Sequence, residues 1–349
     1  MTGSKITIAG RDVGPGEPTF IVAEVAQGHD GSLGLAHAFV DAAADAKVDA
    51  IKFQTHIAAA ESTPAESFRV AFSRQDKTRT AYWERTGFDE AAWEGLARHA
   101  VDRGLVFLSS AFSIEAVDLL ERVGMAAWKV GSGEVTNQPL LTRMAKTRRP
   151  VLLSSGLSSF ADLDAAVDIL RQAETNFAVF QATTAYPTAP EQIGLNVLDE
   201  LRARYECPVG LSDHSGTIFP SIAAVTLGAS LIEVHLTLAR EMFGPDVVAS
   251  VTPHELGLLT RGVRYIEAAL ANPVAKDKVA EELAPLRLLF GRSVVAARAL
   301  PAGTVLSEND LALKKPGGGL PPDQRAKLVG RRLRRALEAD VALAEEDVE

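Results

Sequence analysis

The chain has 349 residues, 47% of them hydrophobic and 23% charged, and its formal net charge is −9. The apolar content excludes a wholly disordered chain, and the acidic balance argues against nucleic acid as the main partner. A single cysteine excludes an intrachain disulfide framework, and neither a membrane span of roughly 18 apolar residues nor a signal-peptide pattern is present, so we expect a cytoplasmic protein without a membrane partner.

Short apolar runs alternate with longer helical patterns along the first 270 residues or so. The runs predicted as strands are 20–24, 50–54, 106–110, 127–130, 150–154, 178–182, 208–212 and 231–235. The clearest helical patterns are 33–46, 88–103, 114–123, 160–172 and 221–227. Strands that alternate with helices indicate a parallel sheet, and eight of them in roughly 250 residues favour a (β/α)8 TIM barrel over an open doubly wound sheet.

Both ends of the chain depart from this rhythm. Residues 6–9, with a turn at 14–17, predict a small hairpin that closes the bottom of the barrel. Residues 272–282 are charged and helix-poor, as expected of a linker, and a second, β-rich pattern begins near residue 293. We therefore predict a barrel domain over 1–271, a linker over 272–289 and a small β-rich domain over 290–349, which is marginal in size for independent folding.

Nearly every predicted strand ends in a polar or reactive residue, although a buried strand should be apolar throughout. In (β/α)8 barrels the active site is built at the C-terminal rim from the ends of several strands. These side chains are therefore expected to form an anion pocket at one rim, the alternative being that strand ends simply meet solvent. The residues are Glu24, Lys52, Gln54, Ser110, Lys129, Ser154, Thr183, Ser212, Asp213 and His235.

Two histidines, His214 and His235, follow successive predicted strands. Neutral imidazoles from adjacent strand ends can share a metal ion and leave positions open for oxygen ligands, or both can be satisfied by hydrogen bonds within the fold. His29, after the first strand, is expected within reach of the same rim. The histidines expected at the surface or behind the site are His37, His56, His99 and His254.

The string Lys129-Val-Gly-Ser-Gly-Glu134 is the most informative local motif. Lys129 supplies positive charge, Ser132 lies between two glycines whose backbone N–H groups can approach an anion, and Glu134 can hold a hydroxyl group or a proton. A plain glycine turn is the alternative interpretation. Lys52 or Lys129 can also be read as the Schiff-base lysine of an aldolase.

Taken in chain order, several motifs resemble those of the sialic acid synthase family, which condenses phosphoenolpyruvate with an N-acylated hexosamine. They lie at residues 23–32, 52–56, 129–134, 210–214, 233–235 and 244–246. Residues 314–319 resemble part of the antifreeze-like (SAF) domain that ends these synthases. The resemblance implies a TIM barrel followed by this small domain, in a domain-swapped homodimer where the small domain caps the partner's site.

The resemblance also implies roles for individual residues. The expected phosphoenolpyruvate contacts are Lys129, Ser132, Ser154 and Ser212. The positions expected around the sugar and the reacting atoms are Lys52, Gln54, Glu134, Tyr186 and Asp246. Glu24 matches a carboxylate that handles a proton, and with Lys52, Glu134 and Asp246 it completes the expected catalytic set. Ser110, Asp213, Thr184 and Lys315 are added as substrate-binding residues, and His214 with His235 is expected to hold a divalent metal, typically Mn²⁺, with Mg²⁺ or Co²⁺ as alternatives.

Three positions depart from the family pattern. Gly28 and Thr184 replace asparagines, and Lys315 replaces an arginine whose planar fork a lysine cannot reproduce. The departures leave the acceptor open between N-acetylmannosamine, a diacetamido sugar and an unacylated sugar. The hypothesis is a transferase (EC 2.5.1) that makes a nine-carbon 2-keto-3-deoxy (nonulosonic) sugar acid and phosphate. The alternatives are a Schiff-base aldolase on the same barrel and a carbohydrate-binding protein without catalysis.

Overall fold

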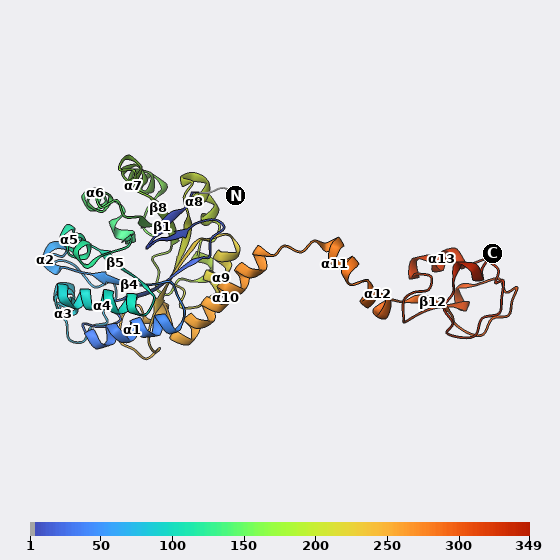
Figure 1. Cartoon of the computed structure of the whole chain (residues 1–349). Helices are drawn as coiled ribbons and strands as arrows, with labels where there is room; N and C mark the ends of the chain where they lie inside the picture. Colours follow the sequence, from blue (N-terminus) through green and yellow to red (C-terminus); the bar gives the residue numbers. More distant parts are fainter. Residues whose placement is uncertain (1–3) are drawn as a thin grey trace. The chain divides into compact units, whose positions relative to one another are not determined.

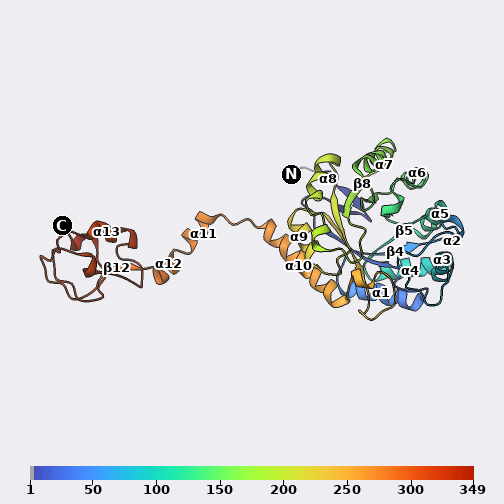
Figure 2. The ribbon, with the colours of Figure 1, turned by 180° about the vertical axis from the view of Figure 1, so that it is seen from behind.

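The computed structural model describes residues 4–349, in two compact units: the first ends at Ala271 and the second begins at Asn272. In the first unit, helices surround a ring of strands, as the opposite views of Figures 1 and 2 show. Among the helices of residues 4–349, none combines the length and the apolar character needed to cross a membrane.

Within the described residues, eight parallel strands close into a barrel, which confirms the predicted fold class. Each strand pairs with the next, and the last pairs with both its predecessor and the first, with the two-residue strand β11 (Ser250–Val251) added at its end. The barrel strands are β3 (Phe20–Ala26), β4 (Ala50–Thr55), β5 (Val106–Ala111), β6 (Trp128–Val130), β7 (Val151–Ser154), β8 (Phe177–Ala182), β9 (Val209–Asp213) and β10 (Leu231–Leu236).

Several helices outside the barrel start at capping residues that the sequence supplies. Ser32, Asp89, Ser113 and Ser159 each accept a backbone N–H from the first turn of the helix that follows, which satisfies one of its free donors. The helices are α1 (Leu33–Asp45), α2 (Ala58–Glu61), α3 (Arg79–Thr86), α4 (Glu90–Asp102), α5 (Ile114–Val123), α6 (Gln138–Ala145), α7 (Phe160–Gln172), α8 (Val197–Tyr205), α9 (Phe219–Thr226) and α10 (Pro253–Ala271).

The strands are buried on both faces, because helices cover their outer side. The inner side is tightly filled. A Cβ atom on Gly210 in β9 would lie 2.7 Å from the Phe180 ring and 2.8 Å from the Leu231 carbonyl oxygen, so only glycine fits there. Polar side chains occupy the inside of the barrel toward its C-terminal rim, and these build the site described below.

The N-terminal hairpin consists of β1 (Ile6–Ile8) and β2 (Arg11–Val13). The two strands are joined at Ala9 and Gly10, both with positive φ. The expected turn at 14–17 is present, with the Glu17 N–H donating to the Gly14 carbonyl oxygen at 3.1 Å, but it follows β2 and does not join the two strands. Ile6, Ile8 and Val13 are buried in the main core, and Arg11 pairs with Asp49 just before β4. The hairpin therefore packs at the N-terminal ends of the strands and closes the bottom of the barrel, as predicted.

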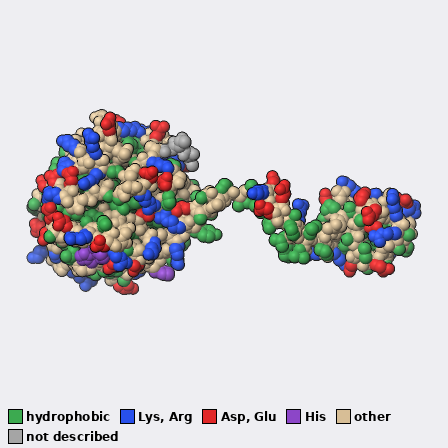
Figure 3. Space-filling model, in the orientation of Figure 1, with side chains coloured by type: hydrophobic (Ala, Val, Ile, Leu, Met, Phe, Trp, Pro, Cys, Tyr) green, Lys and Arg blue, Asp and Glu red, His purple; other side chains and the backbone are tan. Residues whose placement is uncertain are grey.

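The second unit has its own small core around Val294, Leu306 and Leu343. Its antiparallel strands are β12 (Ser293–Ala296) and β13 (Leu311–Lys314), and its helices are α11 (Lys276–Glu282), α12 (Ala284–Phe290) and α13 (Arg325–Leu328). The expectation that 272–282 is helix-poor is wrong, because α11 lies within it. Figure 3 shows apolar side chains gathered over α12, including the exposed Leu286, Leu289 and Phe290.

Candidate active site

Four buried charged side chains meet inside the barrel, at the C-terminal ends of its strands. The Lys52 ammonium of β4 lies 2.6 Å from Glu24 of β3 and 3.6 Å from Glu233 of β10. The Lys129 ammonium of β6 lies 3.4 Å from Glu233. All four side chains are 5% exposed or less. We call these residues the charge cluster; its two positive and two negative charges balance.

Serine hydroxyl groups surround the charge cluster. Lys52 donates to Ser110 Oγ at 3.3 Å, and Lys129 donates to Ser154 Oγ. Ser212 Oγ donates to Glu233 Oε1 at 3.1 Å. The predicted convergence of strand-end residues on one rim is thus present: two cations and three hydroxyl groups lie together, as an anion-binding site requires.

Burial and ion pairing shift the pKa values of the four charge-cluster residues in different directions. Burial raises the pKa of Glu24 to about 7, although Lys52 opposes the shift. Burial alone would raise the pKa of Glu233 too, but Lys129 and Lys52 outweigh it and lower that pKa. Burial also lowers the pKa of Lys129, whereas the two carboxylates raise the pKa of Lys52. Glu24 is therefore poised to exchange a proton near neutral pH.

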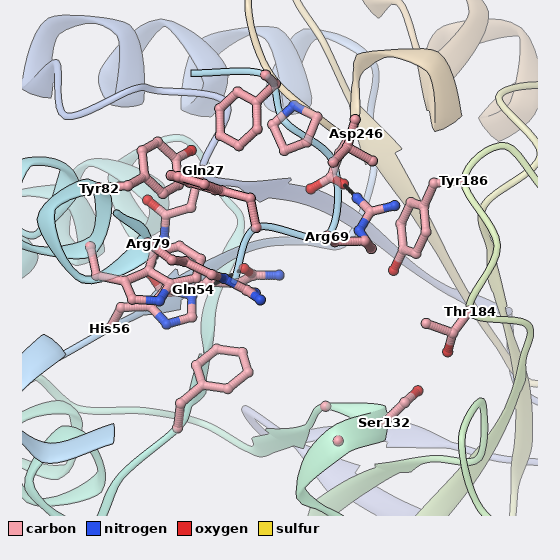
Figure 4. A pocket seen from close by; sticks show the side chains of 18 of the residues that line it. Gln27, Gln54, His56, Arg69, Arg79, Tyr82, Ser132, Thr184, Tyr186 and Asp246 are labelled. Carbon is pink, nitrogen blue, oxygen red and sulfur yellow. Dashed lines mark hydrogen bonds and ion pairs between the residues drawn. The ribbon is translucent and has the colours of Figure 1, made fainter. Parts of the chain in front are cut away.

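A cavity of about 260 Å³ opens at this rim and is drawn in Figure 4. The predicted residues that line it are Gln54, Ser132, Thr184, Tyr186, His235 and Asp246. At its edge, Gly156 leaves little room: a Cβ atom there would lie 2.6 Å from Thr184 Oγ1 and 2.7 Å from Ser132 Oγ. The Gly156 backbone N–H also donates to Ser132 Oγ at 3.2 Å. The glycine thereby keeps both hydroxyl groups at the cavity wall.

The two predicted metal ligands lie close together, with ring centroids 5.3 Å apart. His214 Nδ1 faces the Thr183 carbonyl oxygen at 2.8 Å, so this nitrogen carries the proton and Nε2 keeps its lone pair, which the Tyr186 hydroxyl faces at 3.3 Å. Burial lowers the pKa of His214 to about 4 and that of His235 to about 3. Both imidazoles are therefore neutral at physiological pH, the form that binds metals.

Arg69 is a cavity residue that no sequence motif predicted. Its guanidinium group donates to Asp246 Oδ1 at 2.6 Å and lies over the Tyr186 ring at 4.0 Å, and Figure 4 shows it pointing toward both. Burial raises the pKa of Asp246, and Arg69 opposes that shift. Arg69 lies on the long connection between α2 and α3, where no strand end or motif marks it.

Glu233 and His56 were also missed as site residues. A carboxylate two positions before His235 shares its side of β10, so this signal was present in the sequence. His56, expected at the surface or behind the site, is not at the surface: its side chain is 5% exposed, and it lines the cavity wall next to Gln54. The other cavity residues that were not predicted include Gln27, Phe68, Arg79, Tyr82, Trp83 and Phe112.

Three expected residues are placed differently. The Asp213 carboxylate turns toward α9, where Ser221 Oγ donates to it at 2.9 Å and the Ser215 N–H at 2.8 Å. His29 is fully buried against Phe88, and its Nδ1 accepts from the Gly31 N–H. Glu134 lies outside the cavity lining and accepts from Asn137 at 2.8 Å. Lys315 lies in the second unit, as the resemblance to the SAF domain implies, with its ammonium group 5.4 Å from the Phe290 ring centroid.

Comparisons with known proteins agree with this architecture. The NeuB family model matches residues 39–275, and the SAF domain model matches residues 291–349. The N,N'-diacetyllegionaminic acid synthase of Campylobacter jejuni is 32% identical over 90% of this chain and 95% of its own length. The N-acetylneuraminate-9-phosphate synthase of Homo sapiens is 35% identical over 97% of this chain and 95% of its own. The crystal structure of an N-acetylneuraminic acid synthetase from Leptospira borgpetersenii, in complex with citrate, superposes with a TM-score of 0.72 at 28% identity, and the match covers 80% of this chain and 96% of that one.

Proposed function

We propose, from the premise that this chain belongs to the NeuB family of nonulosonic acid synthases, that it condenses phosphoenolpyruvate with an acylated mannose-type aldose. The products are a nine-carbon 2-keto-3-deoxy sugar acid and inorganic phosphate. The observation that carries the proposal is the charge cluster with its serines, beside a pair of neutral imidazoles and a cavity large enough for a small substrate.

Phosphoenolpyruvate carries a phosphate and a carboxylate, and the charge cluster with its serines offers the matching groups. Lys129 and Lys52 are its cations, and Ser154 and Ser212 add hydroxyl donors within the same cluster. Charge-assisted hydrogen bonds of this kind between buried groups are strong and hold an anion in a fixed orientation. Binding then transfers the lysines from their carboxylate partners to the substrate.

The histidine pair fits a divalent metal, for which we propose Mn²⁺. Among residues 4–349, no group of three or more His, Cys, Asp or Glu is arranged to hold an ion, so the protein would offer the two imidazoles and leave the other positions to water or substrate oxygens. The contact of His214 Nδ1 with a carbonyl oxygen fixes its tautomer, as is typical of metal-binding histidines. A bound divalent cation supplies Lewis acidity toward the aldehyde oxygen of the acceptor.

In the proposed reaction, C3 of phosphoenolpyruvate attacks the aldehyde carbon, and the electrons of the enol double bond form the new C–C bond. The aldehyde oxygen takes up a proton and becomes a hydroxyl group. Water adds to the cationic C2, and Glu24 accepts the first proton that this water loses. The C–O bond to phosphate then breaks, the phosphate leaves with the bonding electrons and takes up the proton of the C2 hydroxyl group, and the 2-keto acid remains. A carboxylate whose pKa lies near 7 suits this proton transfer.

The acceptor sugar is proposed to occupy the cavity, near Tyr186, Asp246, Thr184 and Gln54. The two relatives described above differ in product: one name specifies a diacetylated nonulosonic acid, the other a 9-phosphate. The panel to test therefore contains N-acetylmannosamine, its 6-phosphate, a 2,4-diacetamido sugar and mannose.

We also propose that the active unit is a homodimer in which the SAF domain of each copy caps the other barrel. The exposed apolar residues on α12 support this, because such a patch is rarely left uncovered in a monomer. Light scattering on the purified protein tests the proposal; a monomer at micromolar concentration would contradict it.

A Schiff-base aldolase is the second candidate, because burial lowers the pKa of Lys129 and favours a nucleophilic neutral amine. Borohydride trapping of a covalent lysine adduct would support it.

The deciding assay measures phosphate release from phosphoenolpyruvate with Mn²⁺ and each sugar of the panel. We expect sugar-dependent release that chelation abolishes and Mn²⁺ restores. His214→Ala and His235→Ala should each lose bound manganese, as measured by elemental analysis, whereas His254→Ala, outside the site, should keep it. Full activity after complete chelation would remove the metal role, and borohydride trapping without phosphate release would replace the synthase by the aldolase.

A further inference from the structure

His56 is clamped in the wall of the cavity. It follows β4 directly, and its imidazole stacks between the rings of Trp83, at 3.6 Å and 10°, and Phe112, at 4.3 Å and 12°. Its side chain is 5% exposed. A polar ring held on both faces at this depth keeps one orientation, so its two nitrogens point at fixed partners.

Those partners link His56 to the charge cluster. Nδ1 faces Glu61 Oε1 of α2, and Nε2 faces Gln54 Oε1 at 3.3 Å. Gln54 Nε2 in turn donates to Glu24 Oε1 at 3.0 Å. The other Glu61 oxygen accepts from the Ile57 backbone N–H, which holds that carboxylate in place.

The chain of contacts determines which way the Gln54 amide faces. An amide has one end that donates and one that accepts, and rotated by 180° it would put its oxygen against the Glu24 carboxylate. Both nitrogens of His56 face oxygen atoms, so the ring lies between Glu61 and Gln54, and an N–H at Nε2 meets the oxygen end of the Gln54 amide.

We propose that His56, oriented by Glu61, is a positioning residue: it holds the Gln54 amide so that its NH₂ group faces Glu24. This keeps Glu24 oriented for its contact with the reacting water. The inference rests on the proposed function, in which Glu24 handles that proton. His56 itself acts through Gln54 and takes no part in bond making.

The test uses the full-length protein with Mn²⁺, phosphoenolpyruvate and the panel sugar that the unaltered protein uses, with phosphate release as the readout. His56→Phe keeps a ring between Trp83 and Phe112 but cannot donate. We expect kcat to fall about tenfold, the effect of one lost hydrogen bond to a charged or polar partner, while KM for phosphoenolpyruvate stays within about twofold. The matched control is His37→Phe, a ring-paired histidine on α1 outside the cavity, which should keep its kcat.

A chemical rescue separates positioning from packing. His56→Ala leaves a slot between two aromatic rings, and added imidazole should restore much of its kcat because its protonated form has two N–H groups, which can donate to Glu61 and Gln54 together. 1-Methylimidazole has only one N–H even when protonated, so it should not. The unaltered protein, assayed with both compounds, corrects for inhibition.

Several outcomes overturn the inference alone: an unchanged kcat in His56→Phe, or equal rescue by both compounds. If circular dichroism shows that the two His56 variants do not fold, Glu61→Gln decides. A lower kcat in that variant, at an unchanged melting temperature, would support the inference, and an unchanged kcat would contradict it. If the unaltered protein releases no phosphate with any sugar of the panel, the proposed function itself fails and the inference falls with it.

Discussion

Replacing Glu233 by glutamine should destabilise the barrel strongly, although the two side chains have nearly the same shape. Glutamine still accepts from Ser212, but it removes one negative charge from a cluster of two lysines and two glutamates that are all buried. A buried charge that loses its partner typically costs 3–5 kcal/mol, so we expect the free energy of unfolding to fall by about 3 kcal/mol. Lys129 can limit this loss by giving up its proton, because a buried lysine without a partner is more stable in its neutral form.

The same reasoning predicts that a second substitution offsets the first. Lys129→Met removes the cation opposite Glu233 and alone should also cost about 3 kcal/mol, because it leaves a carboxylate underpaired. The double variant restores the balance of one lysine and one glutamate, so its loss should be smaller than the sum by about 2 kcal/mol. Both Lys129 variants should release no phosphate, because the proposed anion site has lost a cation.

Urea unfolding followed by tryptophan fluorescence measures these differences. Trp83, Trp93 and Trp128, the three tryptophans of the chain, all lie in the barrel unit, so the signal reports on that unit alone. Glu90→Gln, which breaks an exposed pair with Arg122, is the control and should leave the midpoint unchanged. Additive losses in the double variant would refute the view that the four charges act as one balanced cluster.

Three further changes test the site. Burial raises the pKa of Glu24 from 4.5 to about 7, so the contribution of its protonated form to stability is fully present below pH 4.5 and is lost as the pH rises through 7. Between pH 4.5 and pH 8, the free energy of unfolding of Glu24→Gln should therefore rise by about 3 kcal/mol relative to that of the unaltered protein, as measured by urea unfolding at each pH. A difference that does not change with pH would contradict this. Gly156→Ala forces Thr184 or Ser132 to move, so kcat should fall about tenfold or more in the phosphate-release assay; an active variant would show that neither hydroxyl group needs its place. Arg69→Ala should raise KM for the sugar about tenfold and leave KM for phosphoenolpyruvate unchanged, and the reverse pattern would place Arg69 at the wrong substrate.

The barrel was predictable because its strands are covered on both faces. Such strands read as short, continuous apolar runs, and a capping residue such as Ser113 or Ser159 marks where the next helix begins. The hairpin turn was misplaced because Gly14 and Gly16 look like the stronger turn signal, whereas the chain reverses at Ala9 and Gly10. The charged sequence of α11 carries no apolar face, so no periodicity indicated a helix.

Within the site, the strand period explains both the successes and the errors. Successive side chains on a strand point to opposite faces, so Lys52 and Gln54 share a side, but Ser212 and Asp213 cannot. The inward Ser212 reaches Glu233, and Asp213 turns outward to α9. Arg69 reaches its partner Asp246 across 177 positions of sequence, a contact that only the fold brings about.

The two positive and two negative charges of the charge cluster are paired with one another, so an anion that enters the barrel changes more than one of these ion pairs. Lys129 and Lys52 cannot neutralise a bound phosphoenolpyruvate and their own carboxylates equally well, so occupancy leaves Glu24 with weaker support for its negative charge. Glu24 already titrates near neutrality and is the group that would take up hydrogen ions from the medium in response. Calorimetric titration in buffers of different ionisation enthalpy should then give different apparent heats, and Glu24 would pass this proton to the aldehyde oxygen before it accepts the proton of the attacking water.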